Sequence, residues 1–120
     1  MTNVFKPEIF DIEIGGREYT IEFTRSAVKV ADQMGVMNAE SNLAQLEIVF
    51  YVGLMKHKPD VTPNLAKRIL YTAIGEGEEE GEYCLADFAP VLDEFGRWVR
   101  LVFLGNGEKS KKIAARGQSN

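Results

Sequence analysis

The sequence contains one histidine and one cysteine, two side-chain types that often perform acid–base or nucleophilic catalysis. General acid or base catalysis near neutral pH usually recruits histidine, and His57 lies between two lysines and two residues before a proline. We interpret it as a residue at a helix C-terminus that interacts with the helix dipole. Cys84 would need a nearby base to act as a nucleophile, and the sequence indicates no such dyad. The favoured interpretation of Cys84 is a buried structural thiol.

An acidic segment offers ligands for a hard cation such as calcium. It runs Glu76-Gly-Glu-Glu-Glu-Gly-Glu82 and lacks the fixed offsets of Asp or Asn that an EF-hand loop requires. We interpret it as a solvated acidic loop, with docking to a basic partner surface as the alternative. A hydrolase that uses these glutamates around a metal is the least favoured function.

Two further motifs have only a superficial similarity to ligand-binding sequences. In Gly105-Asn-Gly-Glu-Lys-Ser110 the lysine does not directly follow a glycine, and the segment leaves a helix, so we reject a phosphate-binding loop. The break at Pro59 to Pro63 resembles a helix-turn-helix, but the next helix offers only Lys67 and Arg68 as basic groups. The sequence therefore predicts no catalytic, cofactor-binding or metal-binding residue.

The elements that position these residues begin with a predicted β-hairpin. Apolar and polar residues alternate from Glu8 to Ile14 and again from Arg17 to Phe23, which is the period of a half-buried strand. Gly15-Gly16 between them suits the positive φ values of a tight hairpin turn. Because an isolated hairpin is marginal in water, its apolar face must rest on the helices that follow.

The first two predicted helices come directly after the hairpin. One runs from Arg25 to Met34, with Thr24 as its N-cap. The next opens at Asn42, whose spacing from Gln45 resembles a capping box, and runs to about Lys56. This second helix is apolar nearly all round, so it needs cover on more than one side.

Two more helices are predicted in the second half of the chain. Thr62-Pro63 is a strong restart signal, because threonine can cap a helix and proline suits its first position, and the helix it opens runs from Pro63 to Ile74. The last helix starts near Asp87, where Pro90 falls in the first turn, and ends at Leu104.

The predicted fold class is α+β: an N-terminal β-hairpin packed on three to four α-helices, mostly helical, with a disordered C-terminal tail. A chain of 120 residues with 45% hydrophobic content suits one compact domain. We expect a single hairpin-plus-helices domain over 1–104 and a flexible basic tail over 105–120.

Charge and composition indicate the compartment and the partners. The net charge of −4 divides into +3 on the tail and −7 on the body, so the body repels nucleic acid while the short tail could attract phosphates. The start of the chain lacks the features of a signal peptide. Its longest apolar run, Ile48 to Met55, is far shorter than the roughly 20 residues needed to cross a bilayer. A single cysteine fits a reducing compartment. We expect a cytoplasmic protein with no membrane partner and disfavour nucleic-acid binding.

The remaining candidates for function are aromatic, methionine and aliphatic residues on the helices. The second and last helices carry more apolar surface than one hairpin and two small helices easily cover. Four residues are the candidate protein-interface positions: Tyr51, Met55, Trp98 and Val102. Aromatic and methionine side chains supply rigid or adaptable contact area at such interfaces.

The assembled pattern resembles the small tail assembly chaperones of long-tailed bacteriophages and related prophage proteins. The resemblance lies in the hairpin from Ile9 to Phe23 with its Gly15-Gly16 turn, and in the Thr24-Arg25-Ser26 entry into a helix. It continues through the central segment from Ile48 to Thr62 and the late helix followed by a charged tail. It spans nearly the whole chain as a match of pattern and size.

This resemblance implies a non-enzymatic protein that binds the tail tape measure protein and recruits tail tube subunits during assembly. It also implies self-association, absence from the finished virion, and in many members a longer frameshifted product, for which Ser110-Lys111-Lys112 could be encoded by a slippery run. The family has no catalytic residues to transfer to this chain. The alternative function is a small nucleic-acid-associated regulatory protein that uses the basic tail.

Overall fold

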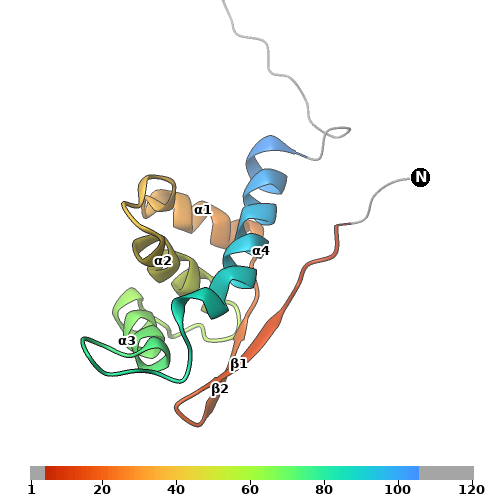
Figure 1. Ribbon diagram of the computed structural model, residues 1–120. Helices are drawn as coiled ribbons and strands as arrows, with labels where there is room; N and C mark the ends of the chain where they lie inside the picture. The colour runs from red at the N-terminus through yellow and green to blue at the C-terminus, as the bar shows by residue number, and fades with distance from the viewer. Residues whose placement is uncertain (1–4, 106–120) are drawn as a thin grey trace, which may run out of the picture.

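The computed structural model describes residues 5–105, and these residues confirm the predicted fold class of a hairpin followed by helices (Figure 1). The hairpin consists of β1 (Phe10–Ile14) and β2 (Arg17–Ile21). The helices are α1 (Arg25–Gln33), α2 (Asn42–Leu54), α3 (Pro63–Ile74) and α4 (Ala89–Val99). Shorter turns complete the set: η1 (Val36–Asn38) and η2 (Leu85–Phe88) are 3₁₀ turns, and η3 (Arg100–Leu104) is a π-helical turn.

The hairpin has the predicted strands and turn. β1 and β2 pair antiparallel, with Phe10 opposite Ile21 and Ile14 opposite Arg17. Gly15-Gly16 joins them with φ values of 59° and 78°, a left-handed pair that glycine adopts without strain. Because side chains alternate across a strand, Ile14 and Ile21 point to the same face, and both are buried. That face rests on the helices.

Two predicted helix starts are confirmed and one is wrong by a residue. The hydroxyl of Thr24 accepts a hydrogen bond from the amide of Ala27 at 3.0 Å, and Thr62 caps α3 in the same way. The cap of α2 is Ser41, not Asn42, because the Ser41 hydroxyl accepts the amide hydrogen bond of Ala44 at 3.0 Å. Serine and asparagine cap about equally well, so the sequence alone could not choose between neighbours.

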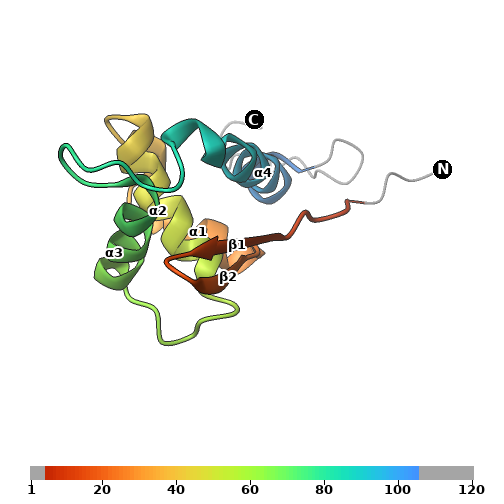
Figure 2. The same cartoon turned by 60° about the horizontal axis from the view of Figure 1, so that its bottom comes forward.

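α2 is the central helix of the molecule. Figure 1 and Figure 2 both show it between α1 and α3, and it also contacts β2 and α4. Its fully buried side chains include Leu46, Val49 and Phe50. The nearly all-round apolar sequence of α2 is therefore covered from several sides within one chain.

Gly53 permits the closest contact between α2 and the hairpin. A Cβ atom at this position would lie 2.6 Å from Cγ2 of Ile21 and 3.1 Å from the ring of Phe23. The backbone amide of Glu22 donates a hydrogen bond to the Gly53 carbonyl at 2.9 Å. The absence of a side chain at Gly53 thus lets a strand end pack directly on the helix backbone.

The last predicted helix is divided into three parts. The 3₁₀ turn η2 precedes α4, Pro90 lies in the first turn of α4 as predicted, and η3 follows it. Phe88 and Phe95 bring this region onto the core, where Phe95 meets the ring of Phe23 with 5.5 Å between centroids. Among the described residues, no helix is long and apolar enough to cross a membrane. The prediction of a disordered basic tail falls mostly on residues outside the described range.

Candidate functional site

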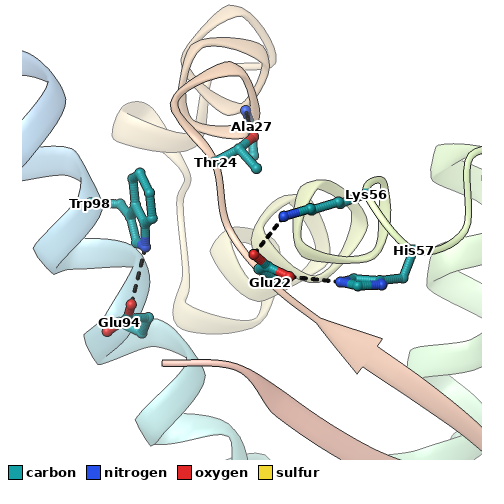
Figure 3. Close-up of polar contacts among 7 residues, drawn as sticks. All are labelled: Glu22, Thr24, Ala27, Lys56, His57, Glu94 and Trp98. Carbon is teal, nitrogen blue, oxygen red and sulfur yellow. Dashed lines mark hydrogen bonds and ion pairs between the residues drawn. The ribbon is translucent and has the colours of Figure 1, made fainter. Parts of the chain in front are cut away.

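His57 is held by a carboxylate that sequence reasoning did not connect with it. Its Nε2 atom lies 2.7 Å from Oε1 of Glu22, and Nζ of Lys56 lies 2.7 Å from Oε2 of the same carboxylate (Figure 3). The Glu22 side chain is only 14% exposed. Hydrogen bonds from Lys56 first and from His57 second lower the pKa of the Glu22 carboxyl below 4.5. The cluster joins the end of β2 to the C-terminal end of α2.

The lowered pKa of Glu22 predicts a specific loss of stability in acid. Stability that depends on this carboxylate is fully present above the unfolded-state pKa, near 4.5, and is lost as the pH falls through the lower folded-state pKa. We expect the urea midpoint of the wild type to fall more than that of Glu22→Gln between about pH 7 and about pH 3. Parallel loss in both proteins would show that the ion pairs of Glu22 contribute nothing to stability.

Cys84 does not have the predicted burial. It is exposed, and the expectation of a buried structural thiol is wrong. Its backbone amide donates to Oδ2 of Asp87 at 2.8 Å, and its Sγ lies 3.4 Å from the same oxygen. Cys84 directly precedes η2, whose buried residue is Phe88. The backbone amide of Cys84 is hydrogen-bonded to Asp87, while its thiol lies at the surface.

The acidic segment packs on the hairpin turn. The amide of Gly15 donates to Oε1 of Glu82 at 3.4 Å, and the hydroxyl of Tyr83 donates to the carbonyl of Glu13 at 2.7 Å. The side chains of Glu76 and Glu78 to Glu80 are exposed, as predicted. Within residues 5–105, no group of three His, Cys, Asp or Glu side chains is arranged to hold a metal ion.

An open hollow of about 1100 Å³ lies between α3 and the acidic segment, with charges of both signs on its walls. Lys67 and Arg68 line it together with Glu76. At its edge the Tyr71 hydroxyl donates to Oε2 of Glu47 at 2.5 Å, and this hydrogen bond, with burial second, raises the pKa of Tyr71 to about 12. The phenol therefore stays protonated at neutral pH.

The four interface candidates do not form one exposed patch. Tyr51, Met55 and Val102 are partly buried and pack against the core. Trp98 is only 9% exposed, so in the isolated chain its side chain belongs to the core. Its ring packs edge-to-face against Phe5, with 4.9 Å between centroids. Sequence patterns could not predict this contact, because it joins residues at opposite ends of the described chain.

A buried carboxylate beside Trp98 was also missed. Glu94 is 1% exposed, and its Oε2 accepts hydrogen bonds from Nε1 of Trp98 at 3.0 Å (Figure 3) and from the amide of Glu8 at 2.9 Å. Its Oε1 accepts from Nη1 of Arg97 at 2.5 Å. Spacings of three and four residues on one helix place Arg97 and Trp98 beside Glu94, and that spacing was available in the sequence.

The large apolar side chains that remain exposed differ from the predicted ones. Among residues 5–105 they are Ile9, Met34, Met37, Leu85, Phe103 and Leu104. Two of them are adjacent in η3, where Phe103 is 48% and Leu104 is 68% exposed. Leu101 and Val102, in the same turn, are partly buried against the core. We call Leu101 to Leu104 the apolar end of the last helix.

The apolar end of the last helix is the candidate contact site, because exposed apolar surface is stabilised when another chain removes it from water. It offers no titratable side chain for proton transfer. Comparisons with protein-family models, with curated proteins and with solved structures found no match to this chain.

Proposed function

We propose that this chain is a non-enzymatic protein-binding protein whose contact site is the apolar end of the last helix. More specifically, we propose that it is a phage or prophage tail assembly chaperone. In this role it binds the tail tape measure protein, recruits tail tube subunits in the host cell cytoplasm, self-associates, and is absent from the finished virion.

One observation carries this proposal: the exposure of Phe103 and Leu104 on consecutive positions of η3. Aromatic and aliphatic side chains at the centre of an interface supply most of its binding energy, while charged residues are depleted there. The resemblance to the chaperone family supports the identity of the partner. It rests on the hairpin from Ile9 to Phe23 with its Gly15-Gly16 turn and on the central segment from Ile48 to Thr62.

Capture of purified partners would test the function. The chain, immobilised through an added tag, is incubated separately with the tape measure protein of the same phage or prophage, with its tail tube protein, and with duplex DNA. We expect retention of the tape measure protein that persists at high salt, because apolar contacts are not screened by ions. Failure to retain it, together with salt-sensitive retention of DNA, would favour the nucleic-acid-associated alternative and contradict the chaperone.

A further inference from the structure

The segment before β1 is attached to a single stretch of α4. Lys6 to Ile9 are exposed, and Phe5 is partly buried. We call residues 5–9 the strap. Figure 1 and Figure 2 both show the strap and the C-terminal end of the last helix on the same side of the molecule.

Four contacts hold the strap on the helix. The amide of Glu8 donates to Oε2 of Glu94 at 2.9 Å, and Nη2 of Arg97 donates to the carbonyl of Lys6 at 3.2 Å. The Arg97 guanidinium lies 4.7 Å from the ring centroid of Phe5, in the geometry of a cation–π contact. The same Phe5 ring packs edge-to-face on Trp98. Phe5 is therefore the anchor of the strap.

Glu94 keeps its charge paired if the strap leaves. Two of its three hydrogen-bond donors, Arg97 and Trp98, belong to the same helix. Strap release would remove only the Glu8 amide from this carboxylate. A buried carboxylate that lost all its partners would be very costly, but here opening leaves the ion pair with Arg97 in place.

Release of the strap would also expose Trp98 next to the apolar end of the last helix. Trp98 packs against Phe5, and Leu101 and Val102 follow it by three and four residues in the adjoining turn η3, where both are partly buried against the core. Beyond them lie the exposed side chains of Phe103 and Leu104. We call the apolar side chains of Trp98 and of Leu101 to Leu104 the apolar strip of the last helix.

We propose that the strap is a releasable cover, which opens independently of global unfolding and uncovers Trp98 as an extension of the apolar end of the last helix. The closed form hides part of this strip from the solvent, and the open form presents a longer one. Segments with few buried contacts open with smaller free energies than core helices. Strap opening concerns this chain alone and does not depend on the identity of any partner.

Hydrogen exchange of the isolated full-length chain tests the proposal directly. The Glu8 amide reports strap closure, and the amides of Val49 and Phe50 in buried α2 report global unfolding. We expect the Glu8 amide to exchange faster than these two in the wild type. Phe5→Ala should accelerate Glu8 exchange about tenfold through loss of the aromatic and cation–π contacts, with α2 exchange nearly unchanged.

Trp98 provides an independent readout, because it is the single tryptophan of the chain. Acrylamide quenching of its fluorescence should rise about twofold in Phe5→Ala, as a larger open population exposes the indole. Lys6→Ala is the matched control, since it removes an exposed side chain and retains the carbonyl that Arg97 contacts; it should leave both readouts unchanged. Glu8 exchange that is as slow as α2 exchange, or that does not respond to Phe5→Ala, would overturn the proposal.

Discussion

Leu46→Ala is expected to lower the free energy of unfolding by about 2–5 kcal/mol, the range for a buried leucine that leaves a cavity. Leu46 is fully buried on α2, and this helix contacts α1, α3, α4 and β2. The elements around such a cavity are held in place by their own packing. They therefore cannot move far enough to fill it. Urea unfolding followed by circular dichroism measures the effect.

The matched control for Leu46→Ala is Leu85→Ala, the same change at an exposed position of η2. Its effect should stay within about 0.5 kcal/mol, as for most surface substitutions. The loss expected for Leu46→Ala is a large fraction of the total free energy of unfolding, which is only about 5–15 kcal/mol for native proteins. Equal effects of the two substitutions would mean that α2 is not the centre of the core.

Glu94→Ala should cost about 2–4 kcal/mol, because it leaves the buried Nε1 of Trp98 without an acceptor and opens a cavity beside it. Arg97 is 39% exposed through its side chain and can return to water, which limits the penalty from the broken ion pair. The measurement is urea unfolding near neutral pH.

Glu94→Gln separates the hydrogen bond of Glu94 from its charge. Glutamine keeps the shape and one acceptor oxygen for Trp98, so its cost should be about half that of Glu94→Ala. If Glu94→Gln proved as damaging as Glu94→Ala, the charge pairing with Arg97 would be the dominant contribution. If neither destabilised the protein, the buried carboxylate would have no structural role.

Local signals were sufficient to predict most of the elements. The Gly15-Gly16 turn, the Thr24 cap and the Thr62-Pro63 restart each depend on neighbouring residues, and each is present in the structure. The cap of α2 was misplaced because Ser41 and Asn42 have similar capping strength. Local patterns therefore predict that an element exists more reliably than they predict the residue at which it begins.

Burial and long-range contacts were predicted less well. The apolar circumference of α2 indicated a need for cover, but the sequence did not show that other elements of the same chain supply that cover. Trp98 was named as a candidate interface position, and its burial against Phe5 could not be foreseen because Phe5 lies 93 positions earlier in the sequence. Phe103 in η3 is exposed, although its neighbours Leu101 and Val102 are partly buried against the core. These positions depend on tertiary packing, which periodicity does not encode.

The central claim is that partner binding depends on the apolar end of the last helix. The most direct test is the affinity for the tape measure protein, measured by calorimetry for wild type, Phe103→Asp and the control Leu85→Asp. Both variants place a charge at an exposed apolar position. We predict that Phe103→Asp weakens binding at least about tenfold, because a charge would be desolvated at the contact, while Leu85→Asp binds as the wild type does. Equal affinities of wild type and Phe103→Asp would contradict the claim.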